Sequence, residues 1–322
     1  MRRILSLVGV NTVVLVVLLL LAEGGLRWRD YPFGGQIVPA ENVLGRFDET
    51  LGWSYRPNVS TDLNFGIGTR AVHFDAHGIR VPTAATRLDP AAPSIVFVGG
   101  SYTMGHGLSF EESFVGQVGA AVAGRYQVVN LGVQAYGTDQ SFLMLQRFFD
   151  DFDVRMVVYT FIDDHTLRNV TDDRRLLHPA GRFLGTKPRF ALDAAGALRL
   201  ADTPARYEDL GPQSYLLGLL RSVGLRTRLI PRDAAAVTRA LVREMDRYCA
   251  ERGAGFVLLN WRWQAGDYDG FDDLGIDVID TLDEAPPEWG PAMQITGWHP
   301  GVAASEYAAG LLVAHVRRAG LL

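Results

Sequence analysis

The sequence predicts an α/β protein whose parallel sheet is preceded by one membrane-spanning helix. Three observations support this prediction. Short, strongly apolar strands alternate with amphipathic helical segments, the strands end in loops that carry glycine, serine or acidic residues, and the chain begins with a long uncharged segment. Alternating strands and helices are typical of βαβ units, which place helices on the faces of a parallel sheet.

The uncharged segment covers residues 4–22, nineteen residues that follow two arginines and consist mostly of leucine and valine. A helix needs about 20 apolar residues to span a bilayer. The leading arginines favour a cytoplasmic N-terminus, although Arg27 and Arg29 beyond the segment weaken the charge bias. A cleaved signal peptide is the alternative, but its apolar region is typically shorter, and no small-residue cleavage site stands out. We expect residues 1–22 to remain as a signal anchor, with the following residues outside the cytoplasm.

Residues 23–92 contain no long periodic segment and are rich in glycine, proline and short apolar pieces. We interpret them as a preface of loops and strands that wraps the main domain and ends in a Pro/Ala linker. His73, Asp75 and His77 alternate and would share one face of a strand, which leaves a metal pair as an alternative. A surface or packing strand is favoured because no second His/Asp cluster matches them.

The strands of the main sheet are expected in residues 93–322. The first is Ser94–Val98, in which β-branched and aromatic residues predict burial on both faces. Further strands are predicted at Gln127–Leu131, Arg155–Ile162, Phe256–Asn260 and Ile276–Ile279, and helices from the capping-box sequence at Ser109, from Thr138, from Asp233 and after Pro300. We therefore expect a sheet of about five strands.

Residues 166–232 interrupt this alternation. The segment Lys187–Leu200 is typical of a hairpin that turns at Ala195-Gly196, and a short helix is expected near Ser214–Val223. We interpret the segment as an insertion at the C-terminal edge of the sheet, where loops commonly carry function. It is expected to wall one side of a pocket.

Composition excludes several classes of protein. A chain of 322 residues has room for one large domain or two smaller ones. The net charge of −5 argues against a nucleic-acid-binding protein, which would usually show a basic patch. The single cysteine, Cys249, excludes an intrachain disulfide framework and a cysteine-based zinc site. We predict neither a cofactor nor a metal ion.

The first strand of the sheet ends abruptly in Gly99-Gly100-Ser101. Glycine there allows a positive φ and a close approach of the backbone to a bound group. Open α/β sheets bind their ligands at the carboxyl ends of their strands. Ser101 is therefore placed where a nucleophile could act.

Other loops at the same edge supply partners for this serine. A serine hydroxyl needs a base to take its proton, and imidazole has a suitable pKa near neutrality, so we predict His299 as the base. The tetrahedral intermediate needs donors for its oxyanion, and the backbone N–H groups of Ser101 and Gly132 are predicted to serve. The third strand brings Asp163 and Asp164 to this edge as a possible acid or as pocket residues.

These residues resemble the conserved blocks of the SGNH/GDSL hydrolases, in their membrane-anchored bacterial form. Gly99–Gly105 resembles the first block, usually Gly-Asp-Ser-x-Thr-x-Gly; Val129–Gln140 resembles the second; Phe161–Asn169 lies where the third is found; and Trp298–Pro300 resembles the fifth. The segments 51–53 and 77–80 are similar to the preface of such proteins, so that the resemblance covers roughly residues 48–318. It implies a flavodoxin-like three-layer α/β/α sandwich. It also implies Ser101 as nucleophile, His299 as base, Gly132 as oxyanion donor, and a domain in the periplasm held at the inner membrane.

Three positions depart from the family pattern. Gly100 replaces the usual aspartate, Asp163 stands in place of the oxyanion-hole asparagine, and Thr296 stands where the aspartate of the triad is expected. An ionised carboxylate cannot donate a hydrogen bond to an oxyanion. Without the usual acid, the imidazole would be held by a backbone carbonyl or by Asp163 or Asp164. Loss of a triad carboxylate weakens such a site without always abolishing its activity.

Other interpretations of these loops are less well supported. A phosphate-binding loop would need Gly-Lys-Ser/Thr or Gly-x-Gly-x-x-Gly, and neither is present. The α/β-hydrolase elbow needs glycine two residues after the serine, where this chain has Thr103. The run Asp163-Asp164-His165 leaves a metal site as an alternative to a solvated strand end. His106 is expected near the pocket rather than as the base.

The sequence thus predicts a serine esterase that acts outside the cytoplasm on O-acyl esters of envelope glycans or lipids. The substrate class is inferred from the expected location alone. Two alternatives remain open. One is an O-acyltransferase that uses a glycan as acceptor, and the other is a catalytically impaired SGNH-fold binding module. The expected partners are a small-molecule or glycan ester and the membrane, and no nucleic acid.

Overall fold

The computed structural model describes residues 2–33, 44–179, 183–227, 229, 233–295 and 298–320. Its centre is an eight-stranded sheet in the order β12-β11-β8-β6-β7-β5-β4-β3. The parallel strands are β6 (Pro93–Gly99), β7 (Gln127–Asn130), β8 (Asp153–Phe161), β11 (Gly255–Asn260) and β12 (Asp277–Asp280). In chain order they lie 2-1-3-4-5, which is the flavodoxin-like arrangement. The predicted fold class is confirmed.

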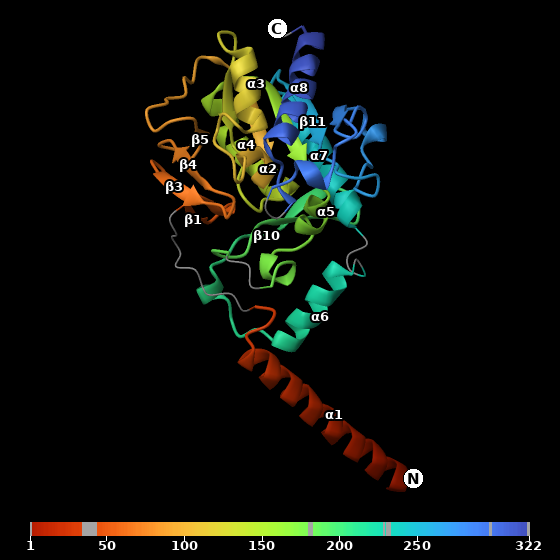
Figure 1. The fold of residues 1–322 in the computed structure, drawn as a ribbon. Coiled ribbons are helices and arrows are strands. Elements are labelled where there is room, and N and C mark those ends of the chain that lie inside the picture. Colours follow the sequence, from red (N-terminus) through yellow and green to blue (C-terminus); the bar gives the residue numbers. More distant parts are fainter. Residues whose placement is uncertain are drawn as a thin grey trace.

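Helices cover both faces of this sheet, which explains why its central strands are apolar throughout. The helices α4 (Thr138–Phe148) and α7 (Ala234–Ala250) share one hydrophobic core with the sheet. On the other face, α3 (Phe114–Val122) and α8 (Val302–Arg318) lie side by side over a second core, as Figure 1 shows. The two cores complete the expected α/β/α layers.

The preface extends the sheet instead of only wrapping it. After a hairpin of β1 (Gly45–Asp48) and β2 (Gly52–Tyr55), the strands β3 (Ser60–Asn64), β4 (Thr69–Phe74) and β5 (Arg80–Val81) add antiparallel strands beside β7. His73 Nδ1 lies 2.7 Å from Ser60 Oγ, whereas Asp75 Oδ1 accepts the backbone N–H groups of His77 and Ile79. These side chains therefore have local structural partners.

The insertion has the two predicted elements. The strands β9 (Arg189–Leu192) and β10 (Leu198–Asp202) form a hairpin with Gly196 at φ 79° in its turn, and Ser214 caps α6 (Tyr215–Arg226). Short helices α2 (Ser101–Met104) and α5 (Asp164–Arg168) begin at strand ends, and 3-10 turns cover Phe149–Asp151, Arg174–Leu176, Tyr207–Asp209, Asp272–Leu274 and Pro291–Met293.

The predicted start of α3 at Ser109 is wrong. Ser109 and Glu112 do form the reciprocal hydrogen bonds of a capping box, at 2.9 and 3.2 Å. That box closes only a turn, because the chain then caps a second time with Ser113, whose Oγ accepts the N–H of Gly116. The helix proper starts at Phe114.

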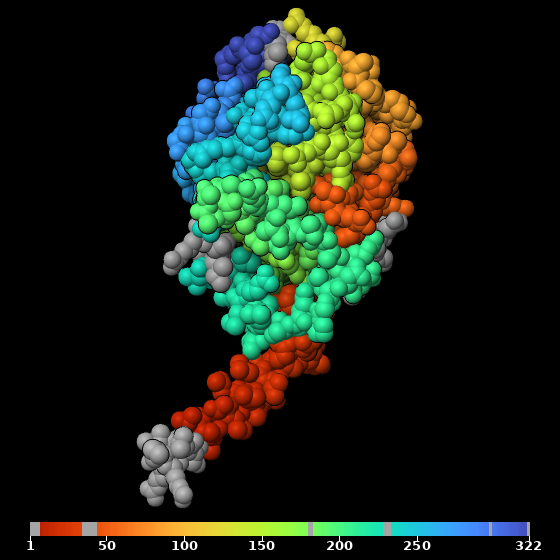
Figure 2. Space-filling model, turned by 180° about the vertical axis from the view of Figure 1, so that it is seen from behind, coloured from red at the N-terminus to blue at the C-terminus, as the bar shows by residue number. Residues whose placement is uncertain are grey.

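The N-terminal helix α1 (Arg2–Trp28) projects from the base of the domain (Figures 1 and 2). Among the described residues, Leu7–Trp28 is long and apolar enough to cross a membrane, and none of it is buried in the protein. In Figure 1 the insertion lies between α1 and the main sheet. That α1 spans a membrane stays a prediction.

Candidate active site

Ser101 stands at the end of the central strand β6 because the turn before it is packed too closely for side chains. A Cβ on Gly99, whose φ is 154°, would lie 2.2 Å from Thr103 Oγ1 and 3.0 Å from the carbonyl oxygen of Thr160. Only glycine fits there. The next residues start α2, so that Ser101 lies on its first turn with its side chain mostly buried.

A buried arginine of the preface holds this turn from behind. Arg80 on β5 is 2% exposed and donates to the carbonyl oxygens of Met104, Gly105 at 2.9 Å and Leu108 at 2.7 Å. Burial lowers the pKa of Arg80 to about 10, which leaves the guanidinium charged at neutral pH. The sequence analysis missed this role, and the likeness of segment 77–80 to the family's preface was the only signal for it.

The structure brings Ser101 and His299 together. His299 Nε2 lies 2.9 Å from Ser101 Oγ, within hydrogen-bonding distance of the hydroxyl that a base would deprotonate. The backbone carbonyl of His299 accepts the N–H of Ile295 at 2.7 Å, and Gln294 pairs with Pro300 in a short bridge. Thr296, the position of the expected triad acid, lies outside the described residues.

The residue after the serine fixes the histidine loop. The Tyr102 hydroxyl donates to the carbonyl oxygen of Trp298 at 2.5 Å and accepts the indole N–H of Trp263 at 2.9 Å. Burial raises the pKa of Tyr102 to about 12, so the hydroxyl keeps its proton at neutral pH. Sequence reasoning passed over Tyr102, although an aromatic residue directly after a nucleophile was a visible signal.

His106 lies against the imidazole of His299 rather than replacing it beside Ser101. Its ring centroid is 4.2 Å from that of His299, and its Nδ1 is hydrogen-bonded to the side-chain amide of Gln134. Burial, together with the neighbouring His299 and Arg80, lowers the pKa of His106 to about 4. His106 is therefore neutral at neutral pH and adds no second positive charge beside an imidazolium at His299.

Gly132 packs directly on the nucleophile helix. A Cβ there would lie 2.4 Å from the backbone nitrogen of Met104 and 2.7 Å from the carbonyl carbon of Thr103. Its N–H donates to Asn130 Oδ1 at 3.0 Å, and Asn130 Nδ2 donates to the Thr103 carbonyl. The oxyanion role of Gly132 stays a prediction, since an oxyanion would have to share this hydrogen. The adjoining loop contains Ala135 at φ 65°, a left-handed conformation that is uncommon outside glycine.

The two aspartates have described contacts with Tyr268 and Arg168. Asp163 Oδ1 accepts the backbone N–H of Tyr268 at 3.3 Å. Asp164 Oδ2 lies 3.1 Å from Arg168, and although burial raises its pKa, Arg168 and Arg174 hold the pKa of Asp164 below its usual range. Their roles as triad acid or pocket residues stay predictions. Within the described ranges, no group of three or more His, Cys, Asp or Glu side chains is placed to hold a metal ion.

Gly100 faces a buried basic pair at the position where the family pattern has aspartate. A Cβ on Gly100 would lie 3.2 Å from His165 Nε2 and 3.4 Å from Arg168 Nη1. His165 is fully buried, its Nδ1 lies 2.8 Å from the Tyr159 hydroxyl, and burial together with Arg168 and Arg174 lowers its pKa well below the usual range. The third strand end therefore supports the serine turn with neutral and cationic groups.

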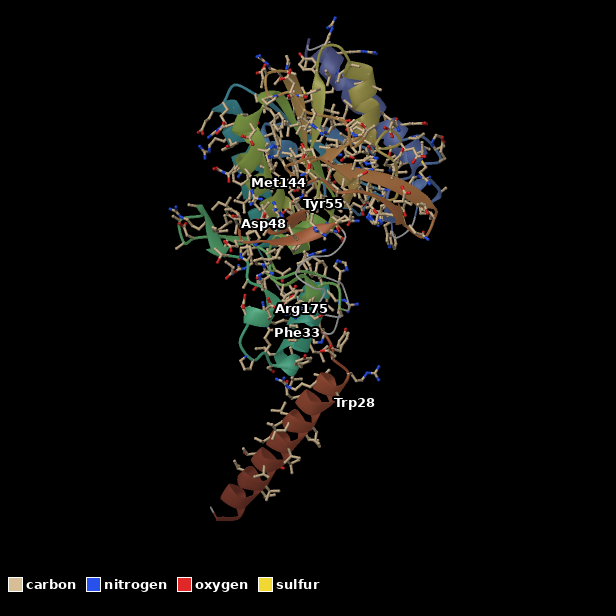
Figure 3. The ribbon with its side chains drawn as sticks, turned by 90° about the vertical axis from the view of Figure 1, so that its left-hand side faces the viewer. Trp28, Phe33, Asp48, Tyr55, Met144 and Arg175 are labelled. Atoms are coloured by element: carbon tan, nitrogen blue, oxygen red, sulfur yellow. The ribbon has the colours of Figure 1, made fainter. Side chains whose placement is uncertain are left out.

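An apolar cavity of about 410 Å³ lies beside the site. The preface supplies Trp53 and Tyr55, which bind the backbone of Gln134 through its carbonyl at 2.9 Å and its N–H at 3.1 Å. The insertion supplies Phe183 and Leu184, as predicted for a wall of the pocket. Figure 3 shows Tyr55, at the end of the preface strand β2, close to Met144 of helix α4. Gln134 lines the cavity and also bonds to His106, whose ring lies 4.2 Å from that of His299. These two side chains separate the cavity from the dyad, and neither Ser101 nor His299 lines it.

No family model matches the sequence, and no curated protein matches it. The structure is similar to that of TesA, at a TM-score of 0.43 and 13% sequence identity over 71% of this chain and 99% of TesA. It is also similar to a member of the lipolytic protein G-D-S-L family from Veillonella parvula (TM-score 0.33, 13% identity, 70% of this chain and 100% of that one). A third is Est24, a carbohydrate acetylesterase from Sinorhizobium meliloti (TM-score 0.31, 11% identity, 70% and 99%). The structural neighbours thus include lipolytic G-D-S-L proteins, acylhydrolases and esterases.

Proposed function

We propose that this protein is a serine ester hydrolase of the SGNH/GDSL type, anchored to the membrane, that acts outside the cytoplasm on O-acyl esters. The observation that carries the proposal is the 2.9 Å hydrogen bond between Ser101 Oγ and His299 Nε2. It lies at the carboxyl end of a flavodoxin-like sheet, where such folds bind ligands.

The dyad is suited to acyl transfer in two steps. Ser101 Oγ attacks the ester carbonyl while His299 Nε2 takes its proton, and the imidazolium then returns that proton to the leaving alcohol. Water, deprotonated by His299, attacks the resulting acyl-serine; the bond to Ser101 Oγ then breaks, the imidazolium returns the proton to that oxygen, and the acid is released. The N–H of Ser101 is proposed to hold the oxyanion in both steps. Proton transfer by a positioned histidine contributes about 10²- to 10⁴-fold to such a reaction.

The apolar cavity supports an ester whose acyl part is hydrophobic. Trp53, Tyr55, Val133 and Phe183 form its walls, and pockets of this kind take up apolar groups because water is released from both surfaces. Together with α1 as an anchor, the cavity supports O-acyl esters of envelope glycans or lipids as the substrate class.

Covalent labelling tests the nucleophile. We expect a fluorophosphonate probe to label the protein at Ser101, and expect Ser101→Ala and His299→Ala to abolish both labelling and hydrolysis of p-nitrophenyl acetate. The chain offers a matched control, because Ser60 Oγ lies 2.7 Å from His73 Nδ1 on the exposed strand β3. Ser60→Ala should change neither reading. Labelling that survives Ser101→Ala, or that disappears with Ser60→Ala, would contradict the proposal.

Two alternative uses of the same site remain. A carboxylate at Asp163, in place of a donor, favours a binding module that has lost turnover. Labelling of Ser101 without hydrolysis of any ester would indicate that module. Acylated sugar formed from an activated ester and a glycan acceptor, at the expense of free acid, would indicate an O-acyltransferase.

The anchor is tested separately from the chemistry. An uncleaved α1 should keep the protein in the membrane fraction after carbonate extraction, and the mature chain should retain its first residues. A mature chain that begins after residue 22 would show instead that the segment is a cleaved signal peptide.

A further inference from the structure

Helix α6 of the insertion exposes an apolar stripe that the fold of the domain does not require. Leu217, Leu220 and Val223 are 58%, 60% and 47% exposed and lie three residues apart along one side of the helix. The opposite side, with Ser222 and Leu225, is buried against the insertion. Contiguous exposed apolar faces on otherwise polar surfaces mark interaction sites.

The start of α6 is fastened to the end of the apolar segment of α1. The Glu23 carboxylate accepts the backbone N–H groups of Tyr215 at 3.0 Å and Leu216 at 2.7 Å, and Arg27 donates to the carbonyl oxygen of Gln213 at 2.7 Å. Glu23 directly follows the uncharged run 4–22. The first turn of α6 is therefore level with the point where α1 would leave the hydrocarbon.

A second set of contacts fixes α6 at this level. The ring of Phe33, just beyond α1, lies edge-on to Tyr215 at 5.3 Å and beneath the guanidinium of Arg175 at 4.8 Å. Figure 3 places Trp28 at the end of α1, and Phe33 with Arg175 directly beyond it. In Figure 1, α6 starts beside the end of α1 and runs in a different direction from it. Figure 2 shows the insertion from the other side, at the base of the domain next to α1.

The residues around the stripe match the chemistry of a bilayer surface. Trp28 is 86% exposed at the end of α1, where transmembrane helices carry their interfacial aromatic residues. Arg221 and Arg226 flank the stripe on its two sides and are exposed; Arg221 also lies 3.4 Å from Asp172, and Arg226 donates to the Tyr31 hydroxyl at 3.5 Å. Long arginine side chains in such positions bury their stems along apolar groups and keep the guanidinium among lipid phosphates.

We propose that α6 lies on the membrane surface as an interfacial helix, with Leu217, Leu220 and Val223 in the boundary between headgroups and acyl chains. Helices of this kind insert their apolar face about 5–10 Å deep. The inference rests on the proposed role of α1 as a membrane anchor. The two helices together would hold the insertion against the bilayer and give the active site a fixed height and orientation above it.

Site-directed labels on the full-length protein in anionic lipid nanodiscs test this placement. Single variants Leu217→Cys, Leu220→Cys and Val223→Cys carry an environment-sensitive fluorophore, with Leu200→Cys on β10, 48% exposed, as the matched control away from α1. The native Cys249 is fully buried and burial raises its thiol pKa to about 12, so introduced cysteines should react selectively. Leu15→Cys reports on α1 itself.

We expect blue-shifted emission at the three α6 positions and loss of fluorescence with a lipid nitroxide placed near the headgroup, more than with one near the chain end. The Leu200→Cys label should stay water-like. Water-like α6 labels beside a quenched Leu15→Cys label would overturn the inference and leave the anchor intact. Shielded α6 labels that no lipid nitroxide quenches would overturn it in favour of a protein partner or a second copy. An unquenched Leu15→Cys label would refute the anchor, and the inference with it.

Discussion

The two halves of the site are held in different ways. The serine turn is held by close packing and by a buried side chain. Gly99 and Gly132 permit contacts that no side chain would allow, and Arg80 donates to three carbonyl oxygens behind the turn. The histidine loop lies at the surface, where Trp298 is 73% exposed, and it is held by the Tyr102 hydroxyl and by backbone hydrogen bonds such as that from Ile295 to His299. The proposed nucleophile is thus fixed by the core of the fold, whereas the proposed base depends on a few hydrogen bonds of a loop.

The largest effect is expected from the dyad itself, where this difference should not matter. Ser101→Ala and His299→Ala should each lower kcat/KM for p-nitrophenyl acetate by about 10³- to 10⁶-fold, and the double variant should be no worse than either. The reason is that His299 acts by activating the Ser101 hydroxyl, so removing either residue removes the same activated nucleophile. Steady-state kinetics on all three variants measures this. Losses that add up would mean that the two residues do not act as a unit.

On the nucleophile side, Arg80→Met should lower the free energy of unfolding by about 2–4 kcal/mol, because buried carbonyl oxygens lose their donor. Urea unfolding measures the change. Arg70 on the neighbouring strand β4 offers a control, since it pairs with Glu112 at the surface at 2.9 Å. Arg70→Met should cost less than about 1 kcal/mol. Similar losses for the two variants would show that Arg80 does not clamp the turn.

On the histidine side, Tyr102→Phe should reduce activity more than stability. The lost hydroxyl binds the carbonyl of Trp298, so kcat should fall about tenfold while the free energy of unfolding changes by about 1 kcal/mol. The rate of fluorophosphonate labelling should fall in parallel. Tyr126→Phe, at the opposite end of β7, is the control and should leave both unchanged. A Tyr102→Phe enzyme with wild-type kcat would show that the hydrogen bond from Tyr102 to the Trp298 carbonyl is not needed to position the loop.

A half-buried histidine beside His299 makes stability depend on pH. Desolvation, together with His299 and Arg80, lowers the pKa of His106 to about 4. Between pH 6.5 and 4 the unfolded chain binds protons that the folded chain does not, so the free energy of unfolding falls as the pH falls through this window. The melting temperature should be lower at pH 5 than at pH 7, and His106→Gln should flatten that dependence. An unchanged slope in that variant would place the titration elsewhere.

Much of the fold follows from local pattern, and the site follows only in part. The alternation of strands and helices was enough to predict a parallel sheet, whereas its flavodoxin-like arrangement was implied by the family resemblance. The glycine turn with the last loop was enough to pair Ser101 with His299. The antiparallel extension by β3–β5 was not predictable, because short polar strands leave no strong period. Arg80 and Tyr102 act through backbone carbonyls that lie 24 and 196 positions away in the sequence, and residue type alone does not reveal such acceptors.

The smallest effect is expected at the most exposed part of the site. Trp298 has φ 76°, a conformation that costs a residue with a Cβ about 1–2 kcal/mol and glycine almost nothing. Trp298 binds Tyr102 through its backbone carbonyl, which Trp298→Gly retains, so kcat should stay within about twofold and the free energy of unfolding within about 1 kcal/mol of wild type. Kinetics and urea unfolding, run beside Tyr102→Phe, measure both. A loss of activity as large as that of Tyr102→Phe would show that the indole side chain holds the loop. Wild-type activity would show that the hydrogen bond from Tyr102 to the Trp298 carbonyl holds it, because Trp298→Gly keeps that bond and Tyr102→Phe removes it.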